Sequence, residues 1–121
     1  MAHWAEVDEN NVVLRVLVGD NNEPDEGYQF MVDTFGGTWL KTSYNTRYNQ
    51  HSLGGTPLRG NYAGIGFTYF PDKDIFMEPS PFNGWVIDDT TASWVAPFPK
   101  PDSGFWVWDN ATSNWVEYEP L

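Results

Sequence analysis

The chain has 121 residues, the length of one domain, and a formal charge of −11 from 17 acidic and 6 basic residues. This acidity disfavours direct binding to nucleic acids and to anionic membranes. The absence of cysteine excludes disulfides, iron–sulfur clusters and a thiol nucleophile. With 17% aromatic residues, 11 glycines and 9 prolines, the composition favours an aromatic core with many turns over a helical bundle.

The first elements expected are two strands. Residues 4–7 and the valine-rich residues 12–18 flank Asp8-Glu9-Asn10-Asn11, whose residue types favour a turn, so the pattern predicts a hairpin. Strict alternation would place Val12, Leu14, Val16 and Val18 on one face of the second strand and Val13, Arg15 and Leu17 on the other. Because both faces contain apolar side chains, we expect this strand to be central in its sheet.

One helix is expected next, from Pro24 to about Phe35. A proline followed by two acids is typical of a helix start, and apolar residues recur at helical spacing until Gly36-Gly37. Residues 38–42 predict another strand. The long glycine-rich segment 44–66 predicts an ordered loop on the surface, with Tyr44, Tyr48 and Tyr62 as its anchors.

The rest of the chain is a series of expected hairpins. Residues 67–77 predict one hairpin that turns at 71–74. Two related segments, WVIDDTTASWV at 85–95 and WVWDNATSNWV at 106–116, recur with a period of 21 residues and predict turns at 88–93 and 109–114. Prolines separate the hairpins and favour extended connectors.

The expected fold class is therefore α+β, mainly antiparallel β with one short helix and with tandem β-hairpins on proline-rich connectors. We expect an N-terminal body of residues 1–70, which includes the long loop 44–66. Residues 71–121 would form an arm of repeated hairpins.

No residue pattern indicates an enzyme. Asp72, Asp74, Asp88 and Asp89 lie in predicted turns, where aspartate is common, and His3 and His51 are far apart. No nucleophile elbow and no phosphate-binding loop is present. We expect no catalytic residue, no metal ion and no cofactor.

The tryptophans are the candidate partner-binding residues, and they have two interpretations. They can pair across strands and stabilise the hairpins, or they can form an exposed face that anchors a partner protein or stacks on sugar rings. Trp106 and Trp108 would share one face of a strand, opposite Val107. The full candidate set consists of Trp85, Trp94, Trp106, Trp108, Trp115, Tyr48 and Tyr62.

Several segments resemble small, largely uncharacterised structural proteins of marine bacteriophages, chiefly those of cyanobacteria. These segments are MAHWAEVDENNVVLRVLV, FGGTWLKTSYNTR, NYAGIGFTYFPDKDIF and the ending from PSPFNGW to NWVEY. The resemblance covers nearly the whole chain. It departs at Met31-Val32-Asp33, where many relatives carry a cysteine, and at residues 50–59, a loop of variable length.

The resemblance implies a virion component that is made in the host cytoplasm. A capsid decoration protein would bind major capsid or tail proteins, or further copies of itself, and not nucleic acid or membrane. A tail or tail-fibre component that recognises host glycans is an alternative. A tail-fibre assembly chaperone, absent from the finished particle, is a third.

Overall fold

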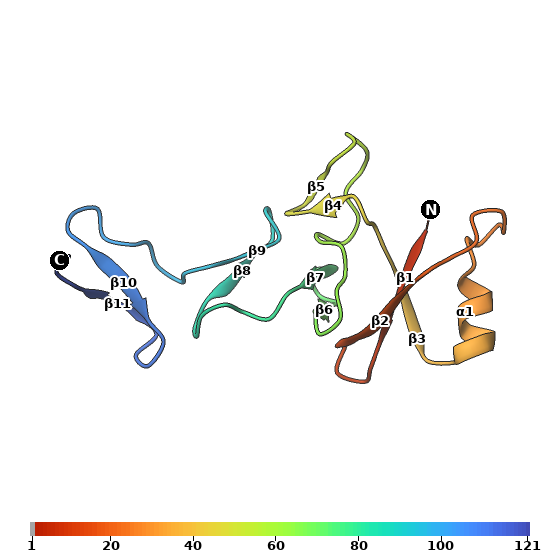
Figure 1. Ribbon diagram of the computed structural model, residues 1–121, viewed down its shortest axis with the longest axis horizontal. Helices are drawn as coiled ribbons and strands as arrows, with labels where there is room; N and C mark the ends of the chain where they lie inside the picture. The colour runs from red at the N-terminus through yellow and green to blue at the C-terminus, as the bar shows by residue number, and fades with distance from the viewer. Residues whose placement is uncertain (1) are drawn as a thin grey trace.

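The computed structural model describes residues 2–121 and is elongated, with the N-terminal sheet and helix at one end and the last hairpin at the other (Figure 1). It consists mainly of antiparallel strands in small sheets with a single short helix, which confirms the predicted fold class. Within residues 2–121, no helix has the length and apolar character needed to cross a membrane. The elements are β1 His3–Val7, β2 Val13–Val18, α1 Tyr28–Phe35, β3 Thr38–Thr42, β4 Thr46–Arg47, β5 Gln50–His51, β6 Thr68–Phe70, β7 Ile75–Met77, β8 Val86–Asp88, β9 Ser93–Val95, β10 Trp106–Asp109 and β11 Asn114–Glu117.

The N-terminal sheet has the strand order β2-β1-β3, so β1 and not β2 is its central strand. The expectation of a central second strand was wrong, because only the start of β2 finds a partner on its outer side. There the Val13 amide donates to the Phe67 carbonyl (2.8 Å), and the Gly66 amide donates to the Val13 carbonyl (2.9 Å).

A β-bulge in β2 breaks the predicted alternation of faces. Val7 pairs with Val13 while Glu6 pairs with Arg15, so Leu14 is the extra residue. Val13 and Val16 consequently lie on the same face, where both pack in the core. Leu14 is left 50% exposed.

Both faces of this sheet are covered. On one face, Trp4 and Trp39 pack with Met31 of α1. On the other, Ala5 and residues of β2 pack with Ala63 of the long loop and Phe76 of β7. The hairpin β6–β7 is therefore part of the same core as the N-terminal sheet.

The helix begins at Tyr28, one turn later than Pro24. Residues 24–27 form a separate turn, and Gly27 adopts a left-handed conformation (φ 93°) immediately before the helix. The Asp25 carboxylate accepts hydrogen bonds from the backbone amides of Gly27 (3.0 Å) and Gln29 (2.8 Å). These two hydrogen bonds hold the pKa of Asp25 below its usual value, and the bond from the Gln29 amide has the larger effect. The expected stop at Gly36 is confirmed.

Small buried polar residues hold the long loop 44–66, and two of the three expected tyrosine anchors, Tyr44 and Tyr62, pack on His3 of β1. Tyr44 and Tyr48 are exposed, and Tyr62 is half-buried. Thr46 and Asn61 are buried instead. The Thr46 hydroxyl accepts from the Leu58 amide (3.1 Å), and the Thr46 carbonyl accepts from the Tyr62 amide (2.8 Å). Backbone groups of a buried loop need such partners, which short polar side chains can supply.

Three successive hairpins share one geometry, although only two of them were recognisable as a sequence repeat. Each has a four-residue turn whose last residue has positive φ: Asp74 (56°), Ala92 (49°) and Ser113 (51°). The predicted turns of all three hairpins are confirmed. The second cross-strand pair from each turn is equivalent in the three hairpins: Tyr69 with Phe76, Ile87 with Trp94, and Trp108 with Trp115.

Candidate functional site

The hairpin β8–β9 is docked on the hairpin before it. The Ala92 side chain at its turn is buried with Ile75 and Met77 of β7, and Ile87 and Trp94 pack around them. The Trp94 indole N–H donates to the Glu78 carbonyl (2.8 Å). The boundary expected at residue 70 thus falls inside the β6–β7 hairpin, and Trp94 belongs to a core shared by two hairpins.

Asn61 holds this docked hairpin in place. Its side-chain amide donates to the Phe76 carbonyl (2.9 Å) and to the Ala92 carbonyl (3.0 Å), and its side-chain oxygen accepts from the Tyr48 amide (2.9 Å). Asn61 was not among the candidates from sequence. An asparagine in a glycine-rich loop gives no local sign that it bridges a residue 31 positions away.

The hairpin β10–β11 is docked through Trp108, which is only 7% exposed. Its ring contacts those of Trp115 (centroids 5.3 Å apart), Phe98 (5.7 Å) and Trp85 (6.0 Å), and its N–H donates to the Asn83 carbonyl (2.9 Å). The edge-to-face pairs with Trp115 and Trp85 add to the stability that burial provides. Trp108 is therefore a packing residue and not an exposed anchor.

The neighbouring tryptophans are half-buried around Trp108. The N–H groups of Trp106 and Trp115 donate to the carbonyls of Ser103 (2.7 Å) and Phe98 (3.0 Å). The N–H of Trp85 is buried and has no hydrogen-bond partner within the described residues. The cross-strand interpretation of the tryptophans thus accounts for Trp108 and Trp115.

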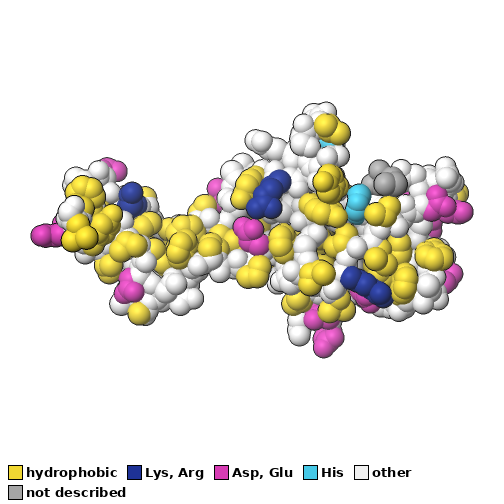
Figure 2. Space-filling model, in the orientation of Figure 1, with side chains coloured by type: hydrophobic (Ala, Val, Ile, Leu, Met, Phe, Trp, Pro, Cys, Tyr) yellow, Lys and Arg dark blue, Asp and Glu magenta, His cyan; other side chains and the backbone are white. Residues whose placement is uncertain are grey.

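The outer face of β10–β11 is apolar and uncovered. Val107 pairs with Val116 across the strands, and the Phe105 and Tyr118 rings lie beside them with centroids 6.0 Å apart. We call these four residues the outer face. Their exposed fractions are 50% for Val107, 37% for Val116, 53% for Phe105 and 46% for Tyr118. Figure 2 shows hydrophobic side chains gathered over this end of the molecule. The signal for this face in the sequence is the alternation along the predicted strand, which places Val107 opposite Trp106 and Trp108.

The equivalent face of an earlier hairpin is covered. Val116 occupies in β10–β11 the position that Met77 occupies in β6–β7. Met77 is 1% exposed because the next hairpin packs on it, whereas nothing within residues 2–121 packs on Val116 in the same way. The last hairpin therefore presents the kind of surface on which another hairpin docks earlier in the chain.

The strands β4 and β5 lie in the middle of the molecule, away from β10–β11 (Figure 1). Tyr48 is in the turn between these two strands, and the Tyr62 amide donates to the Thr46 carbonyl of β4 (2.8 Å). The Arg47 guanidinium stacks on the Tyr48 ring at 4.7 Å, and Tyr62 contacts the rings of Tyr44 and His3. Burial, with a smaller effect of Tyr44, raises the pKa of Tyr62. The seven candidates consequently do not form a single site.

Three of the four aspartates in the acidic pairs have structural partners. Asp89 pairs with Lys73 (3.3 Å). Asp74 accepts hydrogen bonds from Arg59 and Tyr69, and the carboxylates of Asp88 and Asp109 accept from amides two residues later in their turns. Among residues 2–121, no group of three or more histidine or acidic side chains is placed to hold a metal ion.

No family model, no curated protein and no solved structure matches this chain. The resemblance to phage structural proteins stays an expectation from the sequence.

Proposed function

We propose that this protein is a structural component of a bacteriophage virion, a capsid decoration or accessory protein that binds another virion protein through the outer face of β10–β11. The observation that carries the proposal is the uncovered apolar outer face at the end of an elongated molecule. Contiguous exposed apolar surfaces of this kind mark protein interaction sites. The resemblance of most of the chain to phage structural proteins supports the virion context.

The physical basis of such binding is simple. A partner that covers Phe105, Val107, Val116 and Tyr118 would remove large apolar side chains from water without first having to unfold the hairpin. A few aromatic residues in the centre of an interface contribute most of its binding energy. Many copies on one symmetric particle would add the effect of multivalency to a modest single contact.

Two alternatives have weaker support. Glycan recognition by exposed tryptophan rings conflicts with the burial of Trp108, which leaves only half-buried rings around it. A tail-fibre assembly chaperone would need the same outer face during assembly only. Mass spectrometry of purified particles distinguishes the chaperone from the other two, because the chaperone would be absent.

The test of the outer face uses matched variants. Val107 and Val86 occupy equivalent positions in the last two hairpins and are 50% and 47% exposed. We expect Val107→Asp to weaken binding to particles that lack the protein by about 30-fold, or ~2 kcal/mol, with an unchanged melting temperature. Val86→Asp should bind within about twofold of the natural chain. Equal binding by both variants, or absence of the protein from purified particles, contradicts the proposal.

A further inference from the structure

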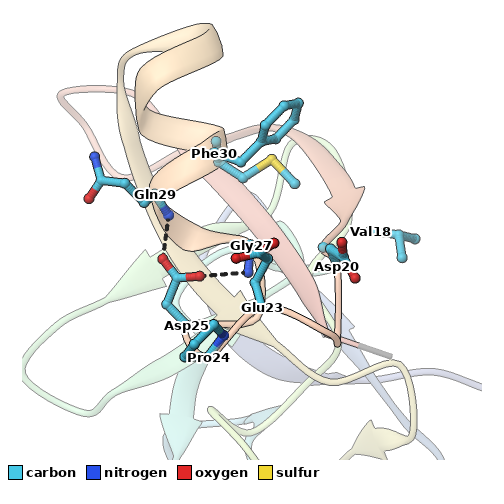
Figure 3. A pocket seen from close by; sticks show the side chains of 10 residues that line it. Val18, Asp20, Glu23, Pro24, Asp25, Gly27, Gln29 and Phe30 are labelled. Atoms are coloured by element: carbon cyan, nitrogen blue, oxygen red, sulfur yellow. Dashed lines mark hydrogen bonds between the residues drawn. The ribbon is translucent and has the colours of Figure 1, made fainter.

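A second surface feature lies at the opposite end of the molecule. A cavity of about 620 Å³ opens between the end of β2, the acidic loop 20–26 and the start of α1 (Figure 3). Its volume is within the range of sites that bind small ligands or peptide side chains, roughly 300–1,000 Å³. It shares no residue with the outer face.

The walls of this cavity are fixed by the fold. Gly19 and Gly27 bring the two ends of the loop together, since a Cβ atom on Gly19 would meet the Glu26 carbonyl oxygen. The Trp4 indole donates to the same carbonyl (2.9 Å), and the Asn21 side chain accepts from the Ala2 amide (2.8 Å). A ligand would therefore meet a preformed cavity.

The lining of the cavity is partly apolar. Met31 is buried beneath it, while Val18 and Phe30 are 51% and 61% exposed on either side. In Figure 3 the Phe30 side chain projects from α1, and Val18 lies across the opening at the end of β2. Large apolar side chains that remain exposed around a cavity favour an occupant with an apolar part.

The rim is acidic, and among the described residues no base pairs with the three acids that line the cavity. Asp20, Glu23 and Asp25 line the cavity, and no lysine or arginine does. Within the described residues, every base except Lys100 already has an acidic partner, and none of these partners is Asp20, Glu23 or Asp25. Lys41 pairs with Glu26 of the same loop (2.8 Å). The same residues contain no cluster of three acids or histidines placed to hold a metal ion. An organic cation thus fits this rim better than a metal.

We propose that this cavity binds an arginine side chain and an adjacent aliphatic side chain from an extended segment of a partner protein. The apolar neighbour and the arginine stem would cover Val18 and Phe30, and the guanidinium would reach Asp20 and Glu23. Arginine suits the site better than lysine because its planar group pairs with carboxylates and stacks on aromatic rings. A second copy of this acidic chain would be repelled.

The test uses the whole 121-residue chain and the peptide acetyl-Leu-Arg-Leu-amide, followed through backbone amide NMR shifts. We expect saturable shifts confined to residues 18–31. The dissociation constant should be in the millimolar range, which corresponds to a binding free energy of about −4 kcal/mol. The same peptide with citrulline, an uncharged analogue of arginine, should bind about fivefold more weakly, the effect of one exposed ion pair. Raising the salt concentration should weaken only the arginine peptide.

Matched variants locate the site. Glu23→Gln should weaken binding of the arginine peptide about fivefold, while Glu119→Gln, an equal charge change on an exposed residue at the other end of the chain, should leave binding unchanged. Phe30→Ser should weaken binding of both peptides. Equal binding of both peptides, equal effects of the two glutamate variants, or no shifts at about 10 mM peptide would overturn the proposal. None of these outcomes affects the proposed role of the outer face.

Discussion

The hairpins β8–β9 and β10–β11 have closely related sequences and the same turn geometry but different surroundings. In β8–β9 the turn residue Ala92 enters a core made by the preceding hairpin. In β10–β11 the equivalent Ser113 is only half-buried, and Trp108 forms a small aromatic core with residues of the connectors. The shared residues thus specify a hairpin, whereas the residues that differ decide how it docks and what it leaves exposed.

The largest expected effect comes from the asparagines that hold the two turns. Asn61→Ala should leave the buried carbonyls of Phe76 and Ala92 and the Tyr48 amide without partners, and should lower the free energy of unfolding by about 3 kcal/mol. The Asn83 side chain makes one such bond, donating to the Asn110 carbonyl (3.0 Å) at an exposed site, while its backbone amide donates to the Asn110 side chain (3.1 Å). Asn83→Ala removes only the first of these bonds and should cost less than about 0.5 kcal/mol. Chemical denaturation measures both values, and similar losses would show that the two docking sites are energetically alike.

The next effect distinguishes a shared core from a local one. Trp108→Ala should destabilise β10–β11 by about 3 kcal/mol, because a buried ring is replaced by a cavity. Ile87→Ala, at the equivalent position of β8–β9, should cost about 2 kcal/mol. Hydrogen exchange should show faster exchange in residues 105–118 alone for Trp108→Ala, but in β6–β9 for Ile87→Ala. Faster exchange throughout the chain in both variants would contradict separate cores.

A smaller effect concerns the two left-handed turn residues. Ser113→Gly should stabilise the last hairpin by about 0.5 kcal/mol, because glycine adopts positive φ without strain and Ser113 contributes little to a core. Ala92→Gly relieves the same strain but removes a methyl group that is 1% exposed, so it should be destabilising by about 0.5 kcal/mol. Thermal unfolding of both variants gives the sign of each change in stability. If both variants are stabilised, the buried methyl group of Ala92 is energetically irrelevant.

The smallest effect is a pH dependence confined to the first of the three hairpins. Tyr69 takes the position that Ile87 and Trp108 take in the later hairpins, and burial, followed by its hydrogen bond to Asp74, raises its pKa. Its contribution to stability is therefore complete below the unfolded value of about 10 and is lost as the pH rises through the higher folded value. The melting temperature of Tyr69→Phe should fall less than that of the natural chain above about pH 10. If the melting temperatures of the two proteins depend on pH in the same way, Tyr69 is not the origin of the loss of stability.

Local patterns in the sequence predicted the hairpins well. The turns predicted at 71–74, 88–93 and 109–114, the strand 38–42 and the stop at Gly36 follow from residues that are close in the chain. The later start of the helix coincides with Gly27, which is left-handed (φ 93°) and where a Cβ atom would meet the Asp20 amide nitrogen. This close approach is a tertiary contact, which the local sequence alone could not indicate. The bulge at Leu14 is likewise a property of pairing and not of the strand alone.

Long-range contacts account for what could not be predicted. Asn61 acts on Phe76 and Ala92, and the aromatic core of Trp108 includes residues from two connectors. No periodicity reveals which hairpin face will be covered by a later segment. The sequence indicated that the last hairpins would be aromatic, but the exposure of Phe105 and Tyr118 depends on where Trp108 packs.

The directional docking of the hairpins has a consequence for how the protein forms during synthesis. β6–β7 packs on the N-terminal sheet, and β8–β9 packs on β6–β7; each finds its support already made by residues nearer the N-terminus. On a ribosome, which delivers the N-terminal part first, folding can follow the order of translation. Since contacts in such an array are mainly between neighbours, gain or loss of one hairpin at the distal end would leave the earlier ones intact. A gene that duplicates 21 codons there could lengthen the reach of the molecule without remaking its core.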